Sequence, residues 1–130
     1  MNIPLGHKNF GMLLLKVCIS AILFMHSIPG IFNGGIEAFG GYLDTKGFEP
    51  IGLQLAWLIK LTHVVAGLCL LFNRWVLWAC ASMILILITG ILMVHGQHGW
   101  FVVGGGTNGV EFNLLLIAAL AAIVLENKKN

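Results

Sequence analysis

The sequence predicts an all-α integral membrane protein: a four-helix bundle with a short amphipathic helix in its first outer loop. Composition is the first observation, because 58% of the 130 residues are hydrophobic and only 9% are charged, whereas about a quarter of a soluble domain is charged. A mean hydropathy of +0.95 is the second. The third is that the apolar residues fall into long continuous runs. A chain of this composition is expected to lie in a lipid bilayer, which is therefore its predicted partner.

Four apolar runs have about the length of membrane-spanning helices. A spanning helix needs about 20 residues, with a range of about 17–25, and the runs occupy residues 12–31, 53–72, 75–94 and 110–125. The last run is the shortest, and residues before it could extend the helix. Together the runs predict a single transmembrane domain over residues 1–130.

Basic residues near the helix ends predict the orientation. If both termini are cytoplasmic, one side of the membrane carries Lys8, Lys16, Arg74, Lys128 and Lys129. Cytoplasmic loops of membrane proteins carry an excess of Lys and Arg. We therefore predict a multi-pass protein with both termini in the cytoplasm.

The first outer loop, residues 33–52, contains the pattern of a short amphipathic helix. Apolar residues recur there at helical spacing, at Ile36, Phe39, Tyr42 and Leu43, and the other side carries Glu37, Asp44 and Lys46. Such a helix lies at the membrane interface. Its predicted role is to cap the bundle, and the alternative role is to gate access to a cavity from the membrane plane. The second outer loop, residues 96–109, is rich in glycine and is predicted to be a flexible linker.

Two classes of function are disfavoured. A net charge of +2 without a basic stripe gives no support for a nucleic-acid partner. Cys18, Cys69 and Cys80 all lie inside apolar runs, and their spacing matches no zinc motif. We assign no metal site and expect no structural disulfide.

Ionisable residues from all four predicted helices fall in the outer half of the bundle when depth is counted at about 1.5 Å per residue. They are His26, Lys60, His63, His95 and Glu111. A charged Lys at membrane depth costs about 2.5 kcal/mol or more, so such a group usually has a partner or a function. Lys60 and His63 are three residues apart and therefore share one helix face.

Each of these residues also has a plain structural interpretation. His95 can end the third helix at the interface, and Glu111 can complement the N-terminal dipole of the fourth. His26 can satisfy a backbone carbonyl freed by Pro29. Lys60 can extend to the interface, although a buried pair or a polar cavity fits its depth better. These interpretations stay open beside the functional ones.

The functional hypothesis is a site for a quinone. Imidazole, carboxylate and ammonium groups together suit the binding and protonation of a quinone oxygen. In this hypothesis the catalytic residues are His63, Lys60 and Glu111. The residues that bind the cofactor are His26, His63 and His95. Haem b, ligated by His26 and His95 at similar depth, is an alternative. A metal held by three histidines and Glu111 is less favoured, because metal-binding histidines usually have closer spacing.

The order and spacing of these features resemble the DoxX family of small four-helix bacterial membrane proteins, over nearly the full length. The resemblance lies in LLLKVCISAILFMHSIPGIF, AFGGYLDTKGFEP, LAWLIKLTHVVAGLCLLFNRW and NGVEFNLLLIAALAAI. His26 stands where the family has a His-Gly pair before a proline, and Glu111 stands at its acidic position. The chain departs from the family at Ser27, where Gly is usual, at Gly30, where many members have a basic residue, and at His63, where an acidic residue is frequent.

The resemblance implies a bacterial cytoplasmic membrane and a redox context, since the family includes a subunit of thiosulfate:quinone oxidoreductase and proteins linked to thiol oxidation. The first hypothesis is a membrane subunit that binds a quinone or a similar small lipophilic molecule in a polar pocket in the outer half of the bundle. Electrons would come from a partner redox protein, because no GxGxxG motif follows a strand, as the binding of a flavin or nicotinamide would require. The second hypothesis is a non-catalytic anchor or assembly partner whose polar cluster fixes helix packing. A homo-oligomer, and whether the protein is an enzyme, stay open.

Overall fold

The computed structural model describes residues 10–104 and 106–129, and every regular element in these ranges is helical. This confirms the all-helical prediction. The chain divides into two compact units, Met1–Trp75 and Val76–Asn130, and each is described by itself. The single domain predicted for residues 1–130 stays a prediction.

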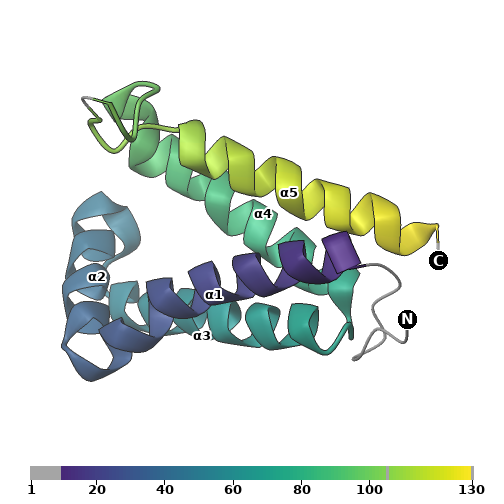
Figure 1. The fold of residues 1–130 in the computed structure, drawn as a ribbon. Helices are drawn as coiled ribbons and strands as arrows, with labels where there is room; N and C mark the ends of the chain where they lie inside the picture. The colour runs from purple at the N-terminus through teal and green to yellow at the C-terminus, as the bar shows by residue number, and fades with distance from the viewer. Residues whose placement is uncertain (1–9, 105, 130) are drawn as a thin grey trace. The chain divides into compact units, whose positions relative to one another are not determined.

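The first unit contains a pair of long helices and a short helix across their end. The long helices are α1, Phe10–Phe32, and α3, Gly52–Leu71; the short helix α2, Gly35–Leu43, continues into a π-helical turn η2, Asp44–Phe48. Helices α1 and α3 lie side by side, and α2 lies at the end where α1 finishes and α3 begins (Figure 1). The three helices thus enclose one end of the unit.

A sharp corner joins α1 to α2. Gly34 adopts a left-handed conformation with φ of 78°, which glycine reaches without steric cost. The Asn33 side chain accepts a hydrogen bond from the Gly35 N–H at 3.0 Å and so satisfies a free donor at the start of α2. A Cβ atom on Gly35 would lie 3.0 Å from the Gly30 Cα. Glycines at this corner therefore let the two helices meet closely.

The predicted apolar face of the loop helix is confirmed as a packing face. Ile36 and Leu43 are buried, and a Cβ atom on Gly40 would lie 2.8 Å from the Leu53 Cα. Asp44 Oδ1 accepts the Gly52 N–H at 2.9 Å, which places a carboxylate at the N-terminus of α3. These contacts fit the capping role predicted for the helix, and the gating role stays a prediction.

Helices α1 and α3 approach each other closely along the unit. The Ser20 hydroxyl donates to the Gly67 carbonyl at 2.9 Å, and a Cβ atom on Gly67 would lie 2.5 Å from Phe24 Cε1. At the end away from α2, the buried Lys16 donates to Asn73 Oδ1 at 2.6 Å. Lys16 therefore lies at the same end of the unit as the basic turn after α3, as the orientation prediction requires.

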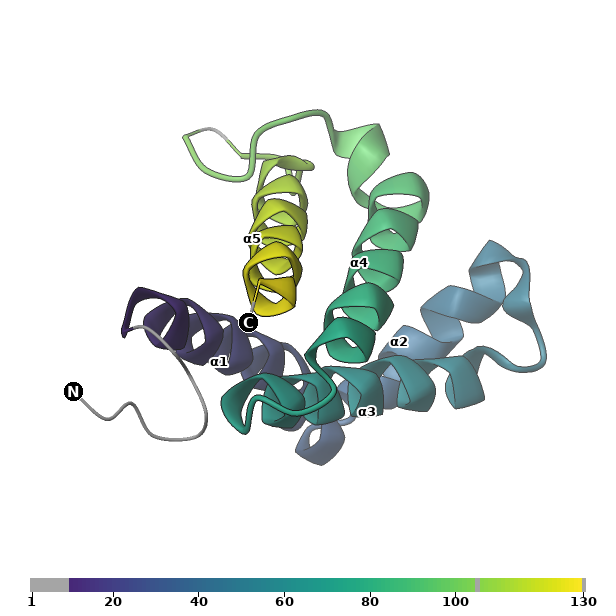
Figure 2. The ribbon, with the colours of Figure 1, turned by 90° about the vertical axis from the view of Figure 1, so that its right-hand side faces the viewer.

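The second unit contains two antiparallel helices that lie side by side, as Figure 2 shows from a second direction. They are α4, Val76–Met93, and α5, Glu111–Lys128, and a 3₁₀ turn η3, His95–His98, follows α4. The buried Asn113 of α5 donates to the Leu87 carbonyl of α4 at 3.3 Å. A polar side chain thus connects the two helices.

The predicted helix bounds agree with the structure to within one helical turn. The possible extension of the last helix before residue 110 is not observed, because α5 begins at Glu111. Thr107 and Gly109 instead donate to the Phe101 carbonyl, and Val110 donates to the Gly99 carbonyl, so these described parts of the predicted linker are joined by hydrogen bonds. Asn108 in this segment has a φ of 62°, a turn conformation that no helix contains.

Within residues 10–104 and 106–129, three helices, α1, α3 and α4, are long and apolar enough to cross a membrane. Helix α5 includes Glu111, Glu126 and Lys128 among its 18 residues. Its uncharged stretch, residues 112–125, is about 21 Å long at about 1.5 Å per residue, which is shorter than a hydrocarbon core of about 30 Å. The fourth membrane crossing and the four-helix bundle therefore stay predictions.

Candidate functional site

Lys60 connects all three helices of the first unit. From α3, its Nζ donates a hydrogen bond to the His26 backbone carbonyl of α1 at 2.7 Å. The same Nζ lies 5.2 Å from the centre of the Phe39 ring of α2, within the range of a cation–π contact. Lys60 is therefore paired with a carbonyl and an aromatic ring, and its position relative to the membrane interface stays a prediction.

The carbonyl that Lys60 contacts lies in the turn that Pro29 interrupts. A proline inside a helix lacks an N–H donor, and its ring displaces the carbonyls of the preceding turn. Lys60, rather than the imidazole of His26, supplies a donor to this turn. The plain role considered for the His26 side chain, a contact with the carbonyl freed by Pro29, stays a prediction.

His63 lies one turn further along α3. Its Nδ1 is 2.7 Å from the Ile59 carbonyl oxygen, and because a carbonyl only accepts, Nδ1 carries the hydrogen. In the neutral imidazole, Nε2 is then a lone-pair acceptor. Lys60 and His26 are both near enough to interact electrostatically with His63. The structure thus gathers three of the five site residues, and their roles stay predictions.

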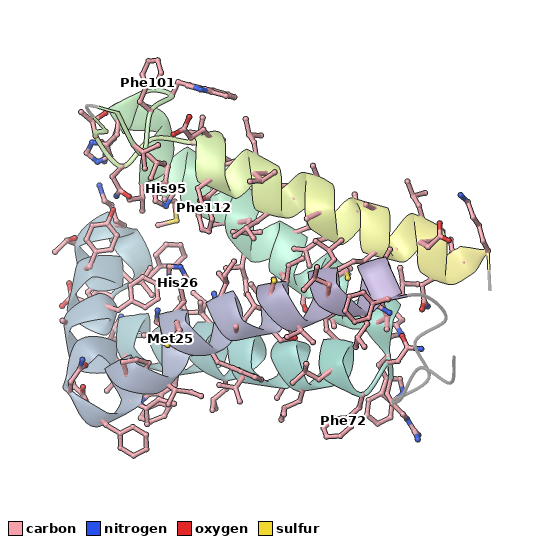
Figure 3. All side chains as sticks on the ribbon, in the orientation of Figure 1. Met25, His26, Phe72, His95, Phe101 and Phe112 are labelled. Atoms are coloured by element: carbon pink, nitrogen blue, oxygen red, sulfur yellow. The ribbon has the colours of Figure 1, made fainter. Side chains whose placement is uncertain are left out.

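The α1 segment beside the site holds one exposed and one buried polar side chain. His26 is exposed and lies in the part of α1 near α2 (Figure 3). Its neighbour Ser27 is fully buried, and its Oγ has no hydrogen-bond partner among residues 10–104 and 106–129. A buried hydroxyl left in this way costs about 1–3 kcal/mol. Sequence reasoning noted Ser27 only as a departure from the family's Gly.

The other two predicted site residues belong to the second unit. His95 Nδ1 lies 2.8 Å from the Asn108 carbonyl, which again leaves Nε2 as an acceptor. Glu111 Oε1 accepts the N–H groups of Val102 at 2.8 Å and Val103 at 3.2 Å. Glu111 also occupies the first turn of α5, where the helix dipole favours an acid. Its carboxylate thus holds the preceding loop, and the assembly of all five residues into one cluster stays a prediction.

Sequence reasoning missed two buried polar side chains. Asn113 is 7% exposed and bonds across the second unit, and Lys16 is 3% exposed and bonds across the first. A polar side chain inside an apolar run was the available signal for both. Lys16 entered only as a marker of orientation, because its position near a helix end suggested contact with the interface.

The histidine and acidic side chains of residues 10–104 and 106–129 do not form a metal site. Among these residues no group of three or more His, Cys, Asp or Glu side chains could hold a metal ion. The haem alternative pairs His26 of the first unit with His95 of the second, and that pairing stays a prediction.

Comparison with known protein families matches residues 11–96 to the family described as DoxX. The chain belongs to the DoxX family. The match includes the positions of His26, Lys60, His63 and His95, whereas α5 and Glu111 lie beyond it. No curated protein and no solved structure matches the chain.

DoxX proteins are generally membrane proteins associated with redox processes, and this DoxX protein has three helices suited to crossing a bilayer. It is therefore a multi-pass membrane protein. The Lys60 site is built from α1, α2 and α3, which all lie within the matched residues.

Proposed function

We propose that this DoxX protein is a membrane subunit of a redox system and binds a quinone, or a similar small lipophilic molecule, at the α2 end of α1 and α3. The observation that carries the proposal is the position of Lys60 Nζ, 2.7 Å from the His26 carbonyl and beside the Phe39 ring. An ammonium has three N–H donors. One serves the carbonyl, and the others remain for a ligand oxygen.

The donors and acceptors of the site suit both states of a quinone. A quinone oxygen accepts a hydrogen bond, which Lys60 supplies. A quinol hydroxyl donates one, which His63 Nε2 accepts because Nδ1 is already bonded to the Ile59 carbonyl. When bound, a quinone supplies two-electron, two-proton chemistry. His63 exchanges the two protons in succession, His26 passes each between the site and water, and a partner redox protein supplies or takes the two electrons.

The remaining predicted site residues have supporting roles in this proposal. Ligand binding by His95, and charge tuning and proton relay to the outer face by Glu111, stay predictions. The protein lies in the bacterial cytoplasmic membrane with both termini cytoplasmic. The contact of Lys16 with Asn73 supports this orientation, because it puts Lys16 at the same end of the first unit as Arg74.

A non-catalytic anchor is the second candidate, because the contacts that favour a ligand site also join helices. The Lys60 contacts hold α1, α2 and α3 together, and Gly67 and Gly40 allow close packing. Haem b is a further alternative. It is favoured by the His95 Nδ1 contact with a carbonyl, since such contacts orient metal-binding imidazoles. A visible spectrum of purified protein without a Soret band would exclude it.

The test is the melting temperature of detergent-purified protein with and without ubiquinone or menaquinone analogues. A ligand at about 100 times its dissociation constant stabilises the folded state by about 2.7 kcal/mol. We expect His63→Ala to abolish this shift. Thr62→Ala is the matched control, because the neighbouring Thr62 hydroxyl bonds only to its own helix, at the Leu58 carbonyl. If His63→Ala lowers stability equally with and without quinone, the packing role is supported instead.

A further inference from the structure

The loop between α4 and α5 presents apolar side chains outward. Trp100, Phe101 and Val103 are 52%, 60% and 73% exposed, and Figure 3 shows Phe101 at the tip of the loop. Residues 94–110 contain no Asp, Glu, Lys or Arg. An exposed apolar patch of this kind marks a contact with a membrane, a ligand or a protein. The loop therefore differs from the charged connection that contains α2.

The same loop satisfies much of its own backbone. Its hydrogen bonds run from Thr107 N and Gly109 N to Phe101 O, from Val110 N to Gly99 O, from Glu111 N to Trp100 O, and from Thr107 Oγ1 to His98 O. Glu111 Oε1 also takes the N–H groups of Val102 and Val103. Within a bilayer each unsatisfied backbone group costs several kcal/mol. These bonds are what an irregular segment needs in order to enter an apolar environment.

Helix α5 is also too short for the bilayer by itself. Its uncharged residues 112–125 reach about 21 Å, against about 30 Å for a hydrocarbon core. Trp100 and Phe101 lie directly beside the N-terminal end of α5, because the Trp100 carbonyl accepts the Glu111 N–H at 3.1 Å. Apolar loop residues at this end supply the contact with lipid that the helix lacks.

We propose that residues 100–103 insert into the membrane leaflet at the α4–α5 connection, and that the Glu111 carboxylate holds the loop in the shape that does so. The lipid interface is the partner that fits best. Tryptophan prefers that depth, and residues 94–110 contain no formally charged side chain. The carbonyls of Trp100 and Phe101 and the N–H groups of Val102 and Val103 are hydrogen-bonded. This insertion is independent of the proposed quinone site.

The test measures the depth of Trp100 in liposomes. Trp57, Trp75 and Trp78 are replaced by Phe, so that Trp100 is the remaining tryptophan, and the protein is reconstituted with phosphatidylcholines brominated at shallow or deep acyl positions. The matched control moves the probe within the loop by combining Gln97→Trp with Trp100→Phe. We expect brominated lipid to quench Trp100 at least twice as strongly as the Gln97→Trp probe, and aqueous iodide to quench Trp100 less.

Two outcomes would overturn the insertion. Strong quenching of Trp100 by iodide without quenching by brominated lipid would place the loop in water. Protection of Trp100 from both quenchers would show that protein, such as a second copy of the chain, covers it. The role of Glu111 has its own measurement. Glu111→Ala is expected to raise iodide quenching of Trp100 at unchanged helix content, and unchanged quenching would remove Glu111 from the proposal.

Discussion

Replacing Lys60 by methionine has two opposing effects on the free energy of unfolding. It removes two stabilising contacts of the first unit, and it also removes the cost of holding an ammonium at membrane depth. The hydrogen bond to the His26 carbonyl measures 2.7 Å, and a bond to a charged group contributes about 1.5–3 kcal/mol. The contact with Phe39, at 5.2 Å, adds about 0.5–1 kcal/mol. Against these losses, a Lys inside a membrane helix costs about 2.5–3.5 kcal/mol. We expect Lys60→Met to change the free energy of unfolding by no more than about 1.5 kcal/mol in either direction.

The assay is thermal unfolding of the purified protein with and without a quinone analogue. Lys60→Met should keep its melting temperature but lose most of the ligand-dependent shift, because it removes the donor to the quinone oxygen. Lys46→Met is the matched control. Lys46 also stands over an aromatic ring, 5.3 Å from the centre of Tyr42, and it lies in the exposed η2 turn away from the His26 carbonyl. Its replacement should leave the quinone shift unchanged.

Two results would refute this reasoning in different ways. If Lys60→Met lowers the free energy of unfolding by more than about 3 kcal/mol, the two contacts of Lys60 outweigh its insertion cost. Lys60 would then mainly fix helix packing. A full quinone shift in a stable Lys60→Met protein would mean that the ligand binds elsewhere or that Lys60 does not touch it.

Three further predictions concern helix packing and buried polar groups, all measured by thermal or denaturant unfolding in detergent. Gly40→Ala should destabilise the protein by about 1–3 kcal/mol, because the new Cβ would meet the backbone of α3. Gly41→Ala is the control and should be neutral or stabilising, because the space around its Cβ is open. Equal effects of the two changes would contradict the packing of α2. Ser27→Ala should be neutral or stabilise by about 1 kcal/mol, since it removes a buried hydroxyl that lacks a partner among the described residues; a clear loss of stability would show that the hydroxyl is bonded. Asn113→Leu should cost about 0.6 kcal/mol, the average for a hydrogen bond between membrane helices, and a loss above about 2 kcal/mol would show a larger role for the 3.3 Å contact.

The helices could be predicted from the sequence because their signal is local. Continuous apolar runs bounded by Gly, Asn or charged residues have few conformations available in a bilayer, so α1, α3 and α4 end within a turn of their predicted limits. The short helix α2 was predictable for a similar reason, since its apolar spacing matches the face that the structure buries. The beginning of α5 was less certain, and the backbone bonds of the preceding loop fixed it at Glu111.

The partners of the site residues could be predicted only in part. Counting residues places Lys60 and His63 on one face of the same helix, but it does not specify which atoms they meet. Lys60 bonds a backbone carbonyl, and every residue offers one, so the sequence carries no signal for that choice. Glu111 was correctly placed in the first turn of α5, yet its carboxylate also bonds amides that precede it by eight and nine positions, and that depends on how the loop folds.

The two contacts of Lys60 differ in what they require of the nitrogen. A hydrogen bond to the His26 carbonyl needs an N–H, which an ammonium and a neutral amine both have. The contact with Phe39 needs the positive charge, because the ring attracts a cation through its quadrupole. A molecule that takes a proton from Lys60 would thus leave the bond between α1 and α3 in place and weaken the hold on α2 by about 0.5–1 kcal/mol. One side chain thereby lets the short helix respond to charge while the two long helices stay paired.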